Sequence, residues 1–456
     1  MKGRNWSPVG TTRRRGLKSF AARLTLRFLA VASIVVTYHL VELHLRYREA
    51  MRAKYLPTRF DSLSGHVEAT LAGTGWDADL YAANAERSTL LDNRRHWKKL
   101  GKGREGETFT FNNTVIKVYN EETTPFRNCM QDTTTASPRR WPTEIPASLI
   151  VGGGGGRGTT SPRNNDDNDD DHDHDPYRNE LFVPVKDYFL ATADPSQPPK
   201  WHLVTPFLRS GTLKKLAKKL RASDGPPPTH RELDRMFRPS FESLLSALDR
   251  LHTAHDLCHD DVKLDNIFVA SERDPRRWAL GDLGNAREPD HPYHLTPLWT
   301  ADTPQLRDCR ANDALRLTRA YLQFLRRSAG GGGGENPDDF DDALMRGVDT
   351  LGSLYWAVAR ASPPLSAAQI WQLSGVYPPQ PEDGVGQTPW STMQPAGVEE
   401  SRRWAPAPAA EAVLGWRWSL RNAVRRELRV GAKEDMGKFF GLTWILGVPV
   451  AACQAT

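Results

Sequence analysis

One acidic stretch between two short apolar segments constrains this chain more than any other feature. It runs from His259 to Asn266 and reads HDDVKLDN, and a second acidic turn, GDLG, follows at Gly281 to Gly284. Ile267 to Val269 and Trp278 to Leu280 have the apolar, β-branched and aromatic composition of strands, so we expect a hairpin that joins the two acidic segments. A solvated loop explains any one of these carboxylates, but it poorly explains the whole series in this order.

The two segments resemble the catalytic loop and the metal-binding turn of the eukaryotic protein kinases, H-R-D-L-K-x-x-N and D-F-G. The spacing D-x-K-x-x-N is intact from Asp261 through Lys263 to Asn266. The resemblance covers about residues 97 to 456, and the overall texture is similar to divergent kinase-like proteins of filamentous fungi. It implies an α+β, two-lobed fold, with a small β-rich lobe over a helical lobe and ATP in the cleft.

The resemblance also implies a role for each side chain. Phosphoryl transfer depends mainly on positioning and on neutralisation of charge. Asp261 would accept the proton of a substrate hydroxyl, and Lys263 would neutralise charge on the transferred phosphate. Asn266 and Asp282 would hold Mg²⁺, a hard cation that prefers oxygen ligands. Lys263 separates the chain from small-molecule kinases of the aminoglycoside and choline type and implies Ser/Thr specificity.

Three positions depart from the kinase pattern, and one further position fits it. Asp260 stands where the family has an arginine that binds a phosphate on the activation segment, so we expect no such phosphate here. Leu283 replaces a phenylalanine, and Gln305 replaces a glutamate that forms an ion pair. Asp313 fits the buried aspartate that accepts hydrogen bonds from the catalytic-loop backbone.

A glycine-rich turn begins the expected nucleotide cleft. Residues 100 to 109 contain the motif G-x-G-x-x-G, made by Gly101, Gly103 and Gly106. Glycine lets the backbone approach phosphates without a clash from Cβ, although a motif of this kind alone usually marks only a turn. Residues 108 to 111 and 114 to 119 flank Asn112-Asn113 and predict a hairpin. This hairpin places Lys117 where a kinase keeps the lysine that binds the α- and β-phosphates.

Two further parts of the cleft are expected from the resemblance. Glu144 is the candidate partner of Lys117, although Pro146 does not suit the middle of a helix. The apolar segment ending in Thr205, Phe207 and Leu208 resembles the strand and hinge that contact adenine. Thr205 would guard the back of the pocket, and backbone groups near Phe207 and Leu208 would bind the base edge.

The order of segments indicates one two-lobed domain with extensions. We expect a strand at Leu181 to Val185, a buried helix from Arg231 to His255, and a core helix in the apolar stretch Phe439 to Ala452. The expected divisions are a basic N-terminus with a hydrophobic helix (1–57), a linker (58–96), a β-rich lobe with a low-complexity insert at 152–175 (97–208), and a helical lobe with loops at 329–337 and 377–410 (209–456).

The segment from Leu24 to Leu45 is long and apolar enough to span a membrane, with Arg27 and Glu42 near its ends. A signal anchor is the first interpretation, and a cleaved signal peptide, a mitochondrial presequence and an amphipathic helix on the kinase lobe are the alternatives. The basic residues before the segment would keep the N-terminus in the cytosol. Asn112-Asn113-Thr114 is a glycosylation sequon that reports on this orientation.

Charge and cysteines narrow the choice of partners. The net charge of +6 comes largely from the region before residue 60, beside the hydrophobic segment, so a membrane flank explains it better than nucleic acid. Four cysteines, Cys129, Cys258, Cys309 and Cys453, show no metal or disulfide spacing. We expect Cys258 to be a small buried apolar residue.

The sequence therefore favours a membrane-associated Ser/Thr protein kinase that uses ATP and Mg²⁺, with an unidentified protein substrate. A pseudokinase that serves as a nucleotide-binding scaffold is the main alternative, motivated by Asp260, Gln305 and the doubtful Glu144. A small-molecule kinase is a minor one.

Overall fold

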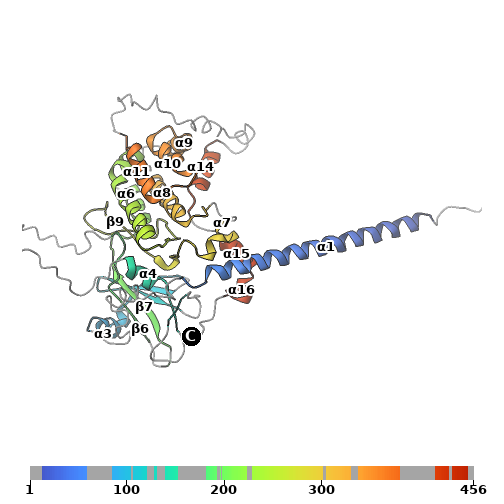
Figure 1. Ribbon diagram of the computed structural model, residues 1–456, viewed down its shortest axis with the longest axis horizontal. Coiled ribbons are helices and arrows are strands. Elements are labelled where there is room, and N and C mark those ends of the chain that lie inside the picture. The colour runs from blue at the N-terminus through green and yellow to red at the C-terminus, as the bar shows by residue number, and fades with distance from the viewer. Residues whose placement is uncertain are drawn as a thin grey trace, which may run out of the picture.

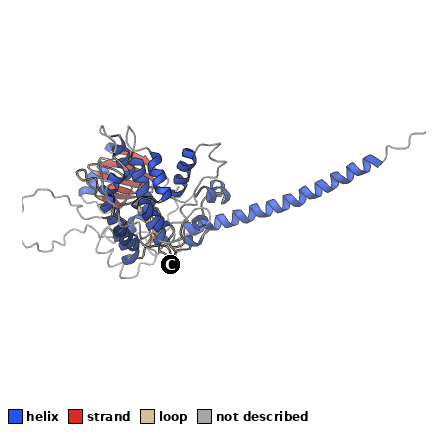
Figure 2. Ribbon diagram, turned by 90° about the horizontal axis from the view of Figure 1, so that it is seen from above, coloured by secondary structure: helices blue, strands red, loops and turns tan. Residues whose placement is uncertain are grey.

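A five-stranded antiparallel sheet and a body of helices make up the computed structural model (Figure 1), which has the α+β architecture expected. The strands gather at one end of the folded body, most of the helices lie beyond one face of the sheet, and the long helix α1 projects away (Figure 2). The structure describes residues 13–58, 85–103, 106–120, 128–130, 139–151, 181–192, 196, 198–222, 228–300, 305–329, 337–380, 416–430 and 434–449.

The sheet has the strand order β1-β2-β3-β7-β6. Its strands are β1 (Lys98–Lys102), β2 (Gly106–Phe111), β3 (Thr114–Tyr119), β6 (Asp187–Ala191) and β7 (Lys200–Pro206). Asn112 and Asn113 both have positive φ angles, 44° and 56°, which suits a tight hairpin turn between β2 and β3. The expected hairpin is therefore formed, and Lys117 lies opposite Thr108 on one side and Leu203 on the other.

The two faces of the sheet are covered differently. Ile116, Phe189 and Val204 face α3 (Ala85–Asp92), which is followed by η2 (Arg94–His96). Because side chains alternate along a strand, Lys117 lies on the opposite face from Ile116. On that opposite face Tyr119, Trp201 and Leu203 join the main core, together with α4 (Glu144–Val151). The alternation of β3 thus turns Lys117 toward the helical body.

The expected strand at Leu181 to Val185 is not formed as such. Pro184 has no N–H to donate to a ladder. The segment makes only a single bridge between Phe182 and Leu280, in which Val183 N donates to Leu280 O at 2.8 Å. The strand that enters the sheet is β6, which begins at Asp187.

The helical body is built around α6 (His230–Ala254) and α8 (Cys309–Ser328). The predicted helix from Arg231 to His255 is confirmed, and Thr229 and Glu232 form a capping box at its start. Phe237 and Phe241 are fully buried against aromatic residues of α8. Around these helices lie α5 (Leu213–Arg221), α9 (Pro337–Arg346), α10 (Thr350–Ala359), α11 (Ala367–Val376) and α14 (Trp416–Glu427).

Helix α1 (Arg13–Lys54) has two parts. From Leu24 to Val41 its large apolar side chains are exposed, whereas Tyr47 and Met51 are buried. Ala22–Lys54 is the only helix in the described part of the chain that is long and apolar enough to cross a membrane, a test that signal sequences also pass.

The expectation of a core helix in Phe439 to Ala452 is wrong. The region contains the short helices α15 (Glu434–Phe440) and α16 (Thr443–Leu446), and Trp444 is 72% exposed. They lie against α1, where the Arg48 guanidinium donates to Gly447 O at 2.9 Å. The insert at 152–175 lies outside the described residues, as do most of the loops at 329–337 and 377–410.

Candidate functional site

The loop that carries Asp261 lies between α6 and a short hairpin. Its strands are β8 (Ile267–Val269) and β9 (Trp278–Leu280), as expected. Three cationic or amide groups surround the Asp261 carboxylate. The Lys263 ammonium donates to it at 2.6 Å, the Asn266 side-chain amide at 3.2 Å, and the Arg316 guanidinium at 3.2 Å. These three donors fix the orientation of the Asp261 carboxylate.

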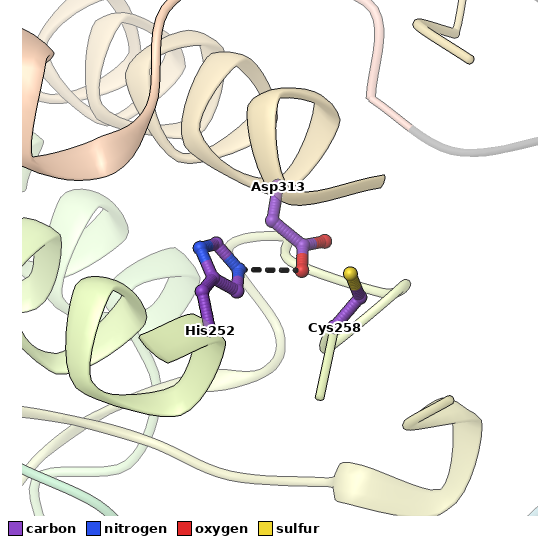
Figure 3. A group of neighbouring side chains, drawn as sticks. All are labelled: His252, Cys258 and Asp313. Atoms are coloured by element: carbon purple, nitrogen blue, oxygen red, sulfur yellow. Dashed lines mark hydrogen bonds and ion pairs between the residues drawn. The ribbon is translucent and has the colours of Figure 1, made fainter. Parts of the chain in front are cut away.

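Asp313 holds the start of this loop from the neighbouring helix α8. Its two carboxylate oxygens accept from the backbone N–H groups of His259 at 2.6 Å and Asp260 at 3.0 Å. His252 lies 3.3 Å from the same carboxylate (Figure 3). The predicted contact between Asp313 and the loop backbone is therefore present. Because Asp313 is completely buried, it fixes the loop from inside the core.

His259 ties the loop to the second acidic turn. Its Nε2 lies 3.1 Å from Gly281 O, while its Nδ1 accepts from Asp261 N at 3.3 Å, an arrangement that fits a neutral ring protonated on Nε2. Gly281 N also donates to Asn266 O at 2.9 Å. The two segments HDDVKLDN and GDLG therefore form one structural unit.

Asp282 faces Lys117 across the site, with 3.6 Å between its Oδ1 and the Lys117 Nζ. Its backbone is in the left-handed region, with φ of 61°, at the start of η3 (Leu283–Asn285). Burial by itself raises the pKa of the Asp282 carboxyl, but Lys117 and Lys263 outweigh it, so the pKa lies below its ordinary value. Asp282 is therefore an anionic oxygen ligand that is ready for a cation.

Lys117 forms the expected ion pair with Glu144 of α4. The Tyr119 hydroxyl donates to the same glutamate oxygen, and the Lys117 Nζ lies 5.1 Å from the centre of the Tyr119 ring. Pro146 causes no break because it lies in the first turn of α4, where a helix needs no N–H donor. Sheet, helix and acidic turn thus meet at a single ammonium group.

The glycine turn joins β1 to β2 at the end of the sheet beside Lys117. Gly103 N donates to Gly106 O at 2.8 Å, and Gly106 pairs with Tyr119. A Cβ at Gly106 would lie 2.0 Å from Val118 O, so this position requires glycine. At Gly101 a Cβ would have nothing within 4 Å, and at Gly103 it would only touch Gly106 O at 3.9 Å, so those two glycines are not required by packing.

The expected hinge follows β7. Thr205 pairs with Val115 in the sheet and is half-buried. The Phe207 N–H donates to Asn113 O at 2.8 Å, so this amide is committed to the β2–β3 turn rather than to a base edge. Leu208 is half-buried, and its O accepts from Gly211 N at 2.9 Å.

Asp260 has partners that the sequence did not suggest. Its carboxylate, buried in the core, accepts from the Arg287 guanidinium at 3.0 Å and from His294 at 2.9 Å. Burial raises the pKa of Asp260, but His294 and Arg287 outweigh it, and the pKa is strongly lowered. For His294 the two effects have the opposite signs: burial lowers its pKa, but the Asp260 carboxylate raises it by more, so the pKa of His294 lies above its ordinary value. Asp260 therefore binds the segment after Asp282 through two buried cationic groups.

Cys258 is buried as expected, but the expectation that the cysteines form no disulfide is wrong. Cys258 forms a disulfide with Cys309, the first residue of α8, with the two Cα atoms 6.0 Å apart. Cys258, His252 and Asp313 lie close enough together to hold a metal ion (Figure 3). The Cys258 Sγ is already bonded to Cys309, and both Asp313 carboxylate oxygens already accept hydrogen bonds, so these atoms do not serve as metal ligands here. Because the two cysteines are 51 residues apart, the sequence contains no local spacing that would have indicated this pairing.

Arg316 is the site residue that sequence reasoning missed. Besides Asp261, its guanidinium donates to Asp260 O at 2.6 Å and lies 3.4 Å from the Gln305 side-chain oxygen. Gln305 therefore serves as a neutral acceptor where the kinase pattern has an ion pair. A helix period counted from Asp313 would have placed Arg316 on nearly the same face of α8.

The sequence matches no model of a known protein family, and no curated protein sequence matches it significantly. The chemistry of the site follows from its own side chains. Asp282 and Asn266 offer oxygen ligands to a hard divalent cation, Lys117 offers a cation to an anionic ligand, and Asp261 lies within the same constellation. Such a set of groups suits a polyanion bound together with a metal.

Proposed function

We propose that this protein is a protein kinase that transfers the γ-phosphoryl group of ATP to Ser or Thr hydroxyls. The observation that carries the proposal is the convergence of Lys117, Glu144 and Asp282 from a strand, a helix and a turn that are far apart in sequence. Positioned charge is the main requirement of phosphoryl transfer, and this arrangement supplies it.

Each group then has a distinct task. Lys117, held by Glu144, binds the non-transferred phosphates, and Asp282 with Asn266 holds Mg²⁺, which neutralises phosphate charge when it is bound. Asp261 accepts the hydroxyl proton, and its orientation comes from Arg316 and Lys263. Asn266 donates to Asp261 through its side-chain nitrogen, so its side-chain oxygen is the atom that would bind Mg²⁺.

The test is phosphate transfer by the purified full-length protein with labelled ATP, Mg²⁺ and a generic protein substrate. Asp261→Asn keeps the shape of the side chain and removes the proton acceptor, so we expect transfer to fall by about 10²- to 10⁴-fold. Asp265→Asn is the matched control, because Asp265 lies in the same loop but is exposed, and among the described residues its ion-pair partner is Lys214. Its activity should remain within about twofold, since exposed ion pairs contribute little.

Equal activity of the two variants would contradict the assignment of Asp261. Binding of ATP without transfer to any acceptor would instead favour the nucleotide-binding scaffold. Transfer to sugars or lipid headgroups in place of protein would reassign the substrate class while leaving the phosphoryl chemistry in place.

A further inference from the structure

The disulfide of the helical body indicates the compartment in which the domain folds. Cys258 and Cys309 are both almost completely buried, and they join the lead-in of the Asp261 loop to the start of α8. Disulfides of this structural kind form and persist in oxidising compartments and are rare in the cytosol. The neighbouring Asp313 carboxylate accepts two backbone hydrogen bonds and lies beside His252, so it is not free to complete a metal site.

The charges around α1 indicate the same side of the membrane. Arg13, Arg14, Arg15, Lys18 and Arg23 precede the apolar segment, and no acidic residue occurs before Glu42. The large apolar side chains from Leu24 to Val41 are exposed and are not covered by the folded domain. If this segment spans a bilayer, its more basic flank remains in the cytosol, and the chain after it crosses to the other side.

The β2–β3 turn carries the third indication. Asn112 is the first residue of the sequon Asn112-Asn113-Thr114, and it lies exposed at the tip of the hairpin. Asn113 is engaged by Arg209 at 2.7 Å, whereas Asn112 makes no hydrogen bond within the described part of the chain. A glycan on Asn112 would therefore project from the sheet without disturbing a contact of the fold.

We propose that the folded domain lies on the non-cytosolic side of a membrane, where Cys258 and Cys309 are joined and Asn112 carries an N-linked glycan. This proposal concerns modification and compartment, and it does not depend on phosphoryl transfer. Together with the proposed function it requires that ATP be supplied on that side.

The chain contains a natural control for the test. A second sequon, Asn5-Trp6-Ser7, lies before the apolar segment, so the two sequons are on opposite sides of it. The full-length protein is expressed in a eukaryotic secretory host, and its mobility is compared before and after removal of N-glycans. We expect one glycan, lost in Asn112→Gln and retained in Asn5→Gln. A glycan that is lost only in Asn5→Gln, or the absence of any glycan, would overturn the proposal.

The thiols provide a second and independent readout. Alkylation of the native protein before reduction, followed by mass analysis, should find the Cys258 and Cys309 peptides linked to each other. Free thiols at both positions would overturn the proposal, and Zn²⁺ retained by that reduced protein would assign them to a metal site with His252. Neither measurement uses ATP, so an inactive protein with the expected glycan would refute only the proposed function.

Discussion

Asp260 shows how one buried carboxylate supports a whole segment of the chain. An arginine here would bind an added phosphate, whereas the carboxylate binds Arg287 and His294, which the chain already carries. The anionic group is therefore the Asp260 side chain of the loop itself, and its cationic partners, Arg287 and His294, lie in the segment after Asp282. We infer that the order of this segment needs no phosphorylation.

Asp260→Asn tests this support. The substitution leaves Arg287 buried without its carboxylate, and breaking a buried pair by removal of one partner costs about 3–5 kcal/mol. We expect the free energy of unfolding, measured by denaturant titration near pH 6, to fall by about 3 kcal/mol. The control Asp265→Asn should lower it by less than about 1 kcal/mol, because that carboxylate is half-exposed.

The effect of Asp260→Asn should also depend on pH. The pKa of His294 is raised above 6.5, so its contribution is complete below that pH and is lost as the pH rises through the raised pKa. The pKa of Asp260 is lowered from 3.8, so its contribution is present above that value and is lost in strong acid. The difference between parent and variant should be largest between about pH 4 and 6.5 and smaller in alkali. A difference that grows with rising pH would contradict the pairing.

For single residues, contacts within one short loop could be predicted from the sequence, whereas contacts with residues far along the chain could not. Asp261, Lys263 and Asn266 lie within one short loop, and their mutual contacts follow from their spacing. Arg287 and His294 reach Asp260 across 27 and 34 residues. Nothing in their immediate sequence distinguishes them from surface cations, because their burial depends on how the segment after Asp282 folds.

Among the elements, the spacing of apolar residues predicted a helix reliably where the helix buries one face and exposes the other. Helix α6 repeats its apolar residues at helical spacing and was located within one residue at each end. The stretch Phe439 to Ala452 is apolar without such a pattern, and its described residues, up to 449, contain only the end of α15 and the short helix α16, beside α1. Hydrophobicity alone does not say whether a segment is covered by protein or by another apolar environment.

The disulfide between the loop lead-in and α8 should stabilise the helical body. The cross-link closes a chain segment of 51 residues, for which the loss of unfolded-state entropy corresponds to about 4 kcal/mol. We expect Cys258→Ser/Cys309→Ser to lower the free energy of unfolding by about this amount. Reducing agent should destabilise the parent similarly and leave the double variant unchanged. Equal sensitivity of both proteins to reductant would show that this cross-link is not the cause.

For the whole molecule, the exposed part of α1 is the least ordinary feature. At 1.5 Å per residue, the segment from Leu24 to Leu45 is about 33 Å long, which matches a hydrocarbon core of about 30 Å. From Leu24 to Val41 its large apolar side chains are exposed, whereas Leu43 and the turns that follow it pack into a cluster with Trp299 and Cys258. The segment is therefore long and apolar enough to cross a membrane, as a signal sequence also would be.

We expect the full-length protein to stay with the membrane pellet after carbonate extraction. Val35→Arg places a charge near the middle of the segment, which costs about 2.5–3.5 kcal/mol on insertion scales, and should reduce the integrated fraction. Leu100→Arg is the matched control, because Leu100 is similarly exposed but lies in β1. Recovery of the parent protein in the soluble fraction would reject the anchor.

The end of α1 has a consequence for the choice of acceptor. Lys54 O accepts from Arg287 at 3.1 Å, and the same helix runs without interruption back to Arg13. For a domain anchored through this helix, the proposed site would lie at a fixed height above the lipid headgroups. Under the proposed function, hydroxyl groups at that height on the stalks of neighbouring membrane proteins would meet the site far more often than hydroxyl groups that diffuse freely.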